Sequence, residues 1–339
     1  MNPSNGDKYL VVKGCAGLGN RLYTVSNAIE YCLKTNRKII VDWSDGQFAK
    51  KGINVFTEFF SLEKIETLIS TEEIKNLEQL TFYPENWKTI LNAGIYDNYI
   101  VSESDLFGFI PYRVFPKGKG KMLRRYWQFS EVTSIRSGGK PAGHLSGLFN
   151  NKNFPFGSDL SESLSEDVVV FADFAPVYSQ ELFLKHVRVK KSVEDKINKF
   201  AGEKNLNSNT IGLHIRSTDK KPTTTTEAIF KKIESLHLKE PSVFLATDNK
   251  FVLEEFQKRF SGLITYPKFL PENTKDGLHQ FALYNDRNEV ALQMFEDSIA
   301  DMWLLSKCEY LFYQGNSSFS MISKVLHQNK NKCYNWLDN

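Results

Sequence analysis

Short apolar runs alternate with amphipathic helical segments along the chain. Residues 9–13 and 38–43 are β-rich runs, and between them residues 22–35 place apolar side chains on one helical stripe. A strand, a glycine turn, a helix and a second strand in this order are typical of a parallel α/β sheet. Residues 168–171 predict a later buried strand of the same domain.

A second series of the same kind follows a polar stretch at residues 203–209. Three buried-type strands are predicted in it, at residues 211–216, 242–247 and 309–313. A helical pattern at residues 291–306 precedes the last of these strands. We therefore expect two domains, with a boundary near residue 200 and an α/β unit on each side.

Composition narrows the class of protein. With 41% apolar and 24% charged residues, the 339-residue chain has globular rather than disordered usage. No apolar run approaches the ~20 residues of a membrane-spanning helix, and the N-terminus lacks the pattern of a secretion signal. The four cysteines form no CxxC or metal-type pair, so we expect reduced thiols and a cytoplasmic protein. A net charge of +3 does not predict a nucleic-acid partner.

Residues 106–156 differ from the rest of the chain because they are rich in aromatic side chains and glycine. No acidic residue occurs from 106 to 130, where the basic residues are Arg113, Lys117, Lys119, Lys121, Arg124 and Arg125. One interpretation is a solvated loop region over a core. The other is an acceptor surface, where sugars stack on aromatic rings and anions pair with basic groups. Peripheral membrane contact through 106–130 is compatible with the second.

A glycine-rich turn at residues 14–21 (Gly-Cys-Ala-Gly-Leu-Gly-Asn-Arg) separates the first predicted strand from the first helix. Glycines there would let a phosphate or sugar approach the helix N-terminus. A Walker A loop needs Lys where Asn20 stands, and a dinucleotide fingerprint needs glycine where Leu22 stands, so neither loop is present. A purely structural turn would explain the glycines but not Asn20 and Arg21.

The string His-Ile-Arg-Ser-Thr-Asp-Lys at residues 214–220 leaves a predicted strand at its C-terminal end, where open α/β sheets bind ligands. Strand alternation puts His214 and Arg216 on one face. Arg216 could hold a diphosphate through two parallel hydrogen bonds, and Lys220 would add a second cation. A lone His-x-Arg would more often be structural, but the full string with Asp219 favours a binding role.

Further polar residues lie at or beside the strand ends of the same half. Asp248 ends one predicted strand, Asp301 lies in the helix before another, and residues 315–318 (Gly-Asn-Ser-Ser) follow that strand. Singly, each would be a cap or turn residue. Together they predict a nucleotide site, because hydroxyls and backbone N–H groups suit phosphate and a carboxylate suits a ribose diol or a guanine edge.

In this order, the motifs resemble a known enzyme superfamily. The glycine turn with its helix and the strand at 36–43 looks like the opening of the NodZ-type bacterial α1,6-fucosyltransferases. Residues 214–220 resemble the HxRRTDK motif of the core α1,6-fucosyltransferases. Later segments match in order, at residues 243–248, 277–279 and 316–318. The resemblance is patchy between 45 and 167 and runs through most of 210–326.

The resemblance implies an α/β, GT-B-like fold with two Rossmann-like domains facing a cleft. The domain at 1–200 would bind the acceptor, a glycan or glycolipid, and the domain at 201–339 would bind the donor, GDP-fucose. Arg216 would neutralise the β-phosphate of the departing GDP, and Asn20 would face the cleft. The other implied substrate-binding residues are His214, Asp219, Lys220, Asp248, His279, Asp301, Asn316, Ser317, Ser318, Gly17, Gly19 and Arg21.

Within that site, the resemblance assigns Asp248 and Asp301 to the guanosine portion and the two serines, Ser317 and Ser318, to phosphate. One position departs from the family: Ser217 stands where the core enzymes have a second Arg. The remaining cation must then come from elsewhere, and the candidates are Lys220, Lys221 and Arg21.

The expected chemistry follows from charge. An inverting transfer builds negative charge on the departing diphosphate while the sugar becomes oxocarbenium-like. Many glycosyltransferases neutralise that charge with a metal held by Asp-x-Asp, a pattern this sequence does not contain. We therefore expect cationic side chains to act without a metal or other cofactor. Glu227 resembles the carboxylate base that follows HxRRTDK, although a helix-start Glu favoured by the dipole explains it equally well.

Three alternatives stay open. A nucleotide-dependent kinase or hydrolase could use the turn at residue 14, although the missing Walker Lys weighs against it. A lectin-like module would bind a glycan or nucleotide without transfer. A glycosyltransferase could also use another nucleotide sugar, as Ser217 suggests.

Overall fold

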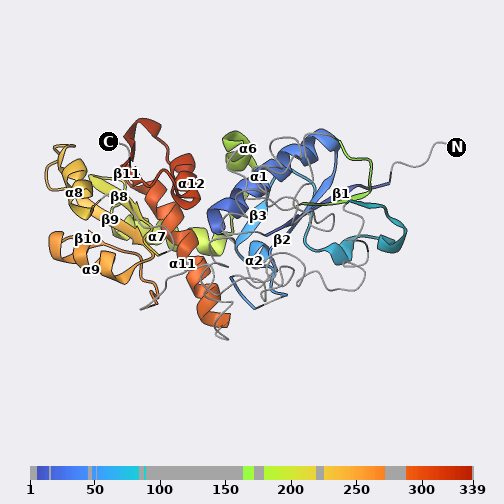
Figure 1. Cartoon of the computed structure of the whole chain (residues 1–339), viewed down its shortest axis with the longest axis horizontal. Coiled ribbons are helices and arrows are strands. Elements are labelled where there is room, and N and C mark those ends of the chain that lie inside the picture. Colours follow the sequence, from blue (N-terminus) through green and yellow to red (C-terminus); the bar gives the residue numbers. More distant parts are fainter. Residues whose placement is uncertain are drawn as a thin grey trace, which may run out of the picture. The chain divides into compact units, whose positions relative to one another are not determined.

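A computed structural model of the 339-residue chain describes residues 6–14, 17–44, 48–50, 52–83, 88, 163–171, 179–218, 225–271 and 288–337 (Figure 1). The chain divides into two compact units. The first comprises Met1–Ala16 and Asn20–Arg188, and the second comprises Gly17–Gly19 and Val189–Asn339. Residue 200 lies inside helix α7 (Lys191–Glu203), which packs against helix α11 (Asn288–Lys307) of the second unit.

The N-terminal unit is built on a five-stranded parallel sheet in the order β4-β2-β1-β6-β5. Its strands are β1 (Tyr9–Lys13), β2 (Lys38–Asp42), β4 (Thr67–Leu68), β5 (Phe82–Tyr83) and β6 (Val168–Phe171). β1 and β6 are buried along their whole length, which is typical of inner strands in a parallel sheet. The strands predicted at 9–13 and 168–171 are confirmed.

Helix α1 (Leu18–Thr35) connects β1 to β2. The sequence predicted its start near residue 22, which is wrong, because the helix already begins at Leu18. Asn20 and Arg21 therefore lie in the first turn of the helix and not in a loop before it. At the other end, Asn36 has a left-handed φ of 52°, which ends the helix where the sequence predicted a stop.

Shorter elements complete the N-terminal unit. Strands β3 (Phe60–Leu62) and β7 (Val187–Val189) form a two-stranded sheet. The short helices are α2 (Val55–Phe59), α6 (Gln180–His186), η1 (Thr71–Glu73) and η2 (Leu77–Gln79). The guanidinium of Arg37 donates to the carbonyl oxygens of Leu164 at 2.6 Å and Asp167 at 3.2 Å, which ties the entry to β6 to the start of β2.

The C-terminal unit has its own five-stranded parallel sheet, in the order β10-β9-β8-β11-β12. Its strands are β8 (Thr210–Ile215), β9 (Ser242–Thr247), β10 (Leu263–Ile264), β11 (Tyr310–Tyr313) and β12 (Cys333–Asn335). The predicted strands of this half are confirmed, with bounds that agree to within about a residue. Because every pair is parallel, the C-terminal ends of all five strands meet at one edge.

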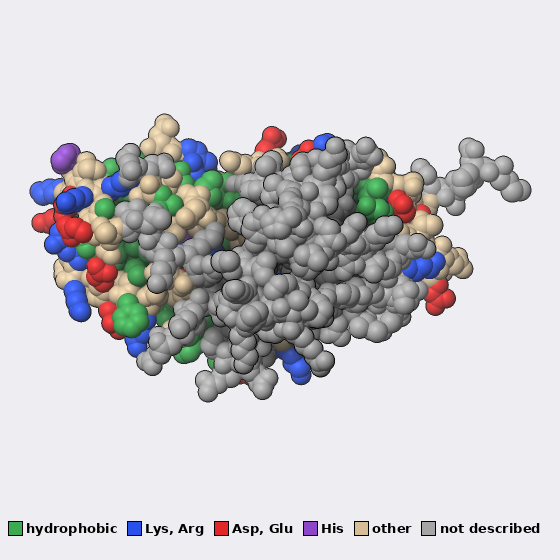
Figure 2. Space-filling model, viewed as in Figure 1, with side chains coloured by type: hydrophobic (Ala, Val, Ile, Leu, Met, Phe, Trp, Pro, Cys, Tyr) green, Lys and Arg blue, Asp and Glu red, His purple; other side chains and the backbone are tan. Residues whose placement is uncertain are grey.

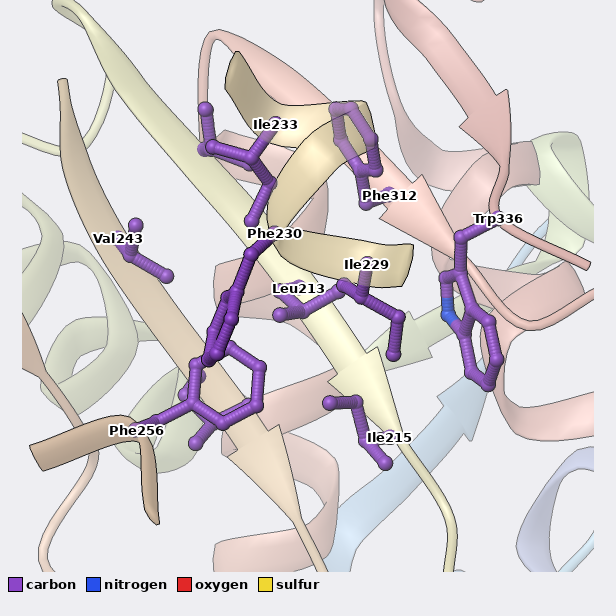
Figure 3. Close-up of a cluster of buried hydrophobic side chains, with 11 residues drawn as sticks. Leu213, Ile215, Ile229, Phe230, Ile233, Val243, Phe256, Phe312 and Trp336 are labelled. Carbon is purple, nitrogen blue, oxygen red and sulfur yellow. The ribbon is translucent and has the colours of Figure 1, made fainter. Parts of the chain in front are cut away.

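One face of this sheet carries a hydrophobic core (Figure 3). Helices α8 (Thr226–Glu234) and α9 (Lys250–Arg259) cover it. The members are Ile211, Leu213, Ile215, Ile229, Phe230, Ile233, Val243, Leu245, Phe256, Phe312 and Trp336. Alternate residues of β8 therefore face this core, which turns Gly212 and His214 to the opposite face.

The opposite face packs against α11, which in turn contacts α7 and helix α12 (Ser318–Leu326). A short turn, η5 (Lys330–Lys332), then leads into β12. Helices thus cover both faces of a parallel sheet, as in a Rossmann-like domain.

Two surface properties bear on the partners of the protein. No helix in the described part of the chain is both long and apolar enough to cross a membrane. In Figure 2, basic and acidic side chains are interspersed over the described surface of the C-terminal unit. The basic, aromatic segment at 106–156, for which an acceptor surface and a membrane contact were predicted, lies outside the described residues.

Candidate active site

Arg216 lies at the C-terminal end of β8, immediately after the last strand residue, and is half-buried. Its backbone N–H donates to Oε1 of Gln314 at 2.8 Å. Gln314 is fully buried and directly follows β11, the neighbour of β8 in the sheet. Its Nε2 donates to Oδ1 of Asn316 at 3.1 Å. The Gln314 side chain therefore fixes the turn that carries Arg216 to the turn that follows β11.

Asp248 organises the same edge from the end of β9. Its Oδ1 accepts from the backbone N–H of Ser217 at 2.7 Å, and its Oδ2 accepts from Oγ1 of Thr218 at 2.6 Å. The carboxylate thus shapes the segment that leaves β8. Its assignment to guanosine stays a prediction.

His214 lies beneath this turn and is almost completely buried. Its Nδ1 shares a hydrogen bond with Oγ of Ser320, and its ring stacks on Phe319 with the centroids 4.8 Å apart. Burial, together with the positive charges of Arg216 and Lys268, lowers the pKa of His214 to about 3. His214 is therefore a neutral residue that holds β8 against α12, and it adds no charge to the site.

The neutral state of His214 predicts a pH dependence of stability. Between the ordinary pKa of 6.5 and about 3, the unfolded chain binds a proton at this residue that the folded chain does not. The free energy of unfolding should therefore fall as the pH drops below 6.5. We expect urea denaturation at about pH 5 and pH 7.5 to show a larger acid loss for the wild type than for His214→Gln.

Asp297 acts in the opposite direction, because burial raises its pKa to about 6 and its protonation stabilises the folded state as the pH falls. This contribution is common to the wild type and the variant, so it cancels in the comparison. Equal acid losses in the two proteins would contradict the assignment of a neutral His214.

The turn after β11 offers unused hydrogen-bonding capacity. Ser317 is fully buried just before α12, and its Oγ has no partner among the described residues. Its backbone N–H donates to the carbonyl of Gln314 at 2.9 Å. The first N–H groups of α12, from Ser318 onward, have no intrahelical acceptor. A hydroxyl beside a helix N-terminus suits a phosphate oxygen.

Gly19, the second residue of α1, approaches this turn closely and belongs to the same compact unit. A Cβ at this position would lie 2.4 Å from the carbonyl carbon of Ser318 and 2.6 Å from the backbone nitrogen of Phe319. Only glycine fits there, which explains why the helix contains it near its start. Gly17 and Leu18 belong to the same unit.

Asn20 and Arg21 lie in the N-terminal unit and differ in exposure. Asn20 is half-buried, and its backbone carbonyl accepts from Oγ1 of Thr24 at 3.1 Å. Arg21 is fully buried, with its guanidinium carbon 5.6 Å from the ring centroid of Trp43 and 4.8 Å from that of Phe48. These cation–π contacts are sufficient reason for an arginine there, and its role toward a substrate stays a prediction.

The C-terminal unit contains a buried ion pair, of which the sequence predicts only one member as a site residue. Nζ of Lys268 pairs with Oδ2 of Asp301 on α11. Burial raises the pKa of Asp301, although the Lys268 charge opposes that shift. The second oxygen of Asp301 is buried and has no partner in the described part of the chain. The sequence singled out Asp301 but missed Lys268 and Gln314.

The other predicted site residues are exposed, half-buried or outside the described ranges. Glu227 is exposed in the first turn of α8, which begins after the N-cap Thr225, and its role as a base stays a prediction. Asn316 is exposed and Ser318 is half-buried at the turn described above. Asp219, Lys220, Lys221 and His279 lie outside the described residues. Within the described ranges, no group of three or more His, Cys, Asp or Glu could hold a metal ion.

Most of the C-terminal half of the sequence matches the model of a known protein family. The family model for Nodulation protein Z (NodZ) matches residues 175–331. The resemblance to NodZ is confirmed. This match contains the Arg216, Asp248 and Ser317 positions, whereas Asn20 and Arg21 lie outside it. No curated protein sequence matches the chain.

Solved NodZ structures share the fold. Fucosyltransferase NodZ from Bradyrhizobium is 16% identical with a TM-score of 0.60, covering 95% of this chain and 94% of that chain. NodZ α-1,6-fucosyltransferase co-crystallised with GDP is 17% identical with a TM-score of 0.60, covering 95% and 93%. The structure of NodZ α-1,6-fucosyltransferase soaked with GDP-fucose is 17% identical with a TM-score of 0.59, again covering 95% of this chain and 93% of that chain. The predicted α/β, GT-B-like class is confirmed.

Proposed function

We propose that the protein is a NodZ-like glycosyltransferase that transfers fucose from GDP-fucose to a glycan or glycolipid acceptor. The observation that carries the proposal is the edge of the C-terminal sheet. There Arg216 emerges from a turn fixed by Gln314 and Asp248, and in the turn after the neighbouring strand β11 the buried hydroxyl of Ser317 has no partner among the described residues. The NodZ structures obtained with GDP and with GDP-fucose support this choice of donor.

In this proposal the site recognises a diphosphate. Arg216 carries a fixed positive charge that can pair with two phosphate oxygens at once. Ser317 Oγ, just before the start of α12, completes the phosphate contacts. Asp248 keeps the turn in shape, and Asp219, Lys220 and His279 of the sequence motifs belong to the same proposed donor site.

The proposed reaction is an inverting transfer without a metal. The bond between the sugar C1 and the β-phosphate oxygen breaks, and its electron pair leaves with GDP. The acceptor hydroxyl forms the new bond on the opposite face of C1 and gives its proton to a general base, for which Glu227 is the candidate. Arg216 stabilises the charge that grows on the leaving diphosphate, and Asn20 is proposed as the third catalytic residue.

The proposal gives each half of the chain a task. The C-terminal half binds the donor, and the N-terminal half, with residues 106–130, binds the acceptor. Cys32, Cys308 and Cys333 are free thiols, which agrees with the proposed cytoplasmic location.

A transfer assay tests the proposal. GDP-fucose is incubated with a panel of oligosaccharides and lipid-linked glycans, with and without excess EDTA, and products are detected by mass spectrometry. We expect a fucosylated product in both conditions, with the configuration at C1 inverted relative to the donor. Loss of activity in EDTA that added metal restores would contradict the metal-free mechanism, and transfer from another nucleotide sugar alone would favour the alternative that Ser217 raises.

A further inference from the structure

Lys268 is a cation with an unusual environment for a lysine. Its side chain is 10% exposed, and that of its partner Asp301 is 6% exposed. It follows β10 (Leu263–Ile264) closely, so it leaves the sheet at the same edge as Arg216 and Asp248. An isolated buried ion pair stabilises a fold less well than apolar side chains of the same size. The presence of this ion pair is therefore better explained by a function than by fold stability.

The packing of α11 places this pair beside the phosphate motif. A Cβ on Gly212 would lie 3.1 Å from the carbonyl oxygen of Leu305, so these two residues are adjacent. Asp301 lies one helical turn before Leu305, about 6 Å along α11. His214 lies two residues after Gly212 on the same face of β8, about 6.6 Å along the strand. Because α11 packs against the face of β8 that carries Gly212 and His214, we infer that Asp301 and the paired Lys268 ammonium lie near His214, at the sheet edge that carries Arg216.

The electrostatics agree with this placement. The charges of Lys268 and Arg216 both contribute to the lowered pKa of His214. An ammonium has three N–H donors, and Asp301 accepts through one oxygen. The donors that remain can reach a further anionic oxygen.

Resting on the proposed function, we propose that Lys268 supplies the second positive charge at the donor diphosphate, and that Asp301 is the positioning residue that holds it there. Lys268 thereby takes the place of the second arginine, whose position is occupied by Ser217. Its positive charge stabilises the electron pair that departs with GDP.

Isothermal titration with GDP and with guanosine tests this inference. In Lys268→Met we expect GDP to bind at least about tenfold more weakly, or ~1.4 kcal/mol, because a phosphate contact is lost. Guanosine, which has no phosphate, should bind within about twofold of wild type. Lys258→Met, an exposed position on α9, makes the same charge change and should leave both affinities unchanged.

The double variant Lys268→Met/Asp301→Asn separates binding from folding. Removal of the lysine alone leaves a buried carboxylate uncompensated, which should lower the Tm, and the second change should restore it. We expect the Tm to recover while the GDP affinity stays low. Recovery of GDP affinity with the Tm, or an equal loss for guanosine, would overturn the inference. Absence of GDP binding by the wild type would instead contradict the proposed function itself.

Discussion

Replacement of Arg216 by alanine is expected to reduce kcat/KM for transfer by about 100-fold or more, because one preorganised donor to a developing anion is worth that much. The fold should survive, since Arg216 is half-buried and its turn is held through the backbone N–H, which alanine keeps. Arg216→Lys should lose nearly as much, because an ammonium cannot form the paired hydrogen bonds of a guanidinium. Steady-state kinetics with a circular dichroism melt measure both effects.

The matched control for Arg216 is Arg259→Ala on α9. Arg259 is exposed and donates to Oε1 of Glu234 at 3.0 Å, away from the strand ends. Its removal should change kcat/KM by less than about twofold, since exposed pairs contribute little. Wild-type rates in both Arg216 variants would rule out a role for this residue at the diphosphate.

Replacement of Trp336 by alanine is expected to cost about 3–5 kcal/mol of unfolding free energy, the range for a large core side chain. Trp336 is fully buried in the core of the C-terminal unit, and its backbone N–H donates to the carbonyl of Tyr313 at 3.1 Å (Figure 3). Its Nε1 donates to the carbonyl of His214 at 2.9 Å. The side chain therefore supports the strand that ends at Arg216, and GDP affinity should fall as well.

Trp336→Phe isolates the hydrogen bond from the volume. Phenylalanine fills most of the space but leaves the carbonyl of His214 without this donor, at a cost of about 1–3 kcal/mol. Urea denaturation measures both variants. A loss below about 1 kcal/mol in Trp336→Ala would show that the core does not depend on this side chain.

The strands could be predicted because each is a short apolar run with a defined end. β1, β6, β8 and β9 lie inside their sheets and are almost fully buried, so their sequences are mostly apolar. The start of α1 could not be predicted, since glycine disfavours helices on local grounds. Gly19 is needed in the helix because the backbone of Ser318, about 300 residues away in the sequence, leaves no room for a Cβ. No local pattern contains that information.

Residues of the candidate site could be singled out from the sequence where they lie at a strand end or in the turn that follows it. Arg216 and Asp248 directly follow strands β8 and β9, and Ser317 lies in the turn between β11 and α12, where the sequence shows them. Lys268 and Gln314 escaped because their importance comes from partners distant in the chain, Asp301 and the backbone of Arg216. A polar residue at the end of an otherwise apolar strand, as at Gln314, is the signal that would have found one of them.

In the proposed function, the C-terminal unit binds a guanosine diphosphate sugar. Thermal-shift titration of the wild-type protein with GDP-fucose, GDP, UDP, ADP and their sugars tests it most directly, because a ligand that binds only the folded state raises the Tm. We predict a concentration-dependent rise with GDP and GDP-fucose, and no shift with the uridine and adenosine compounds. A rise with another nucleotide series and none with any guanosine compound would contradict the account.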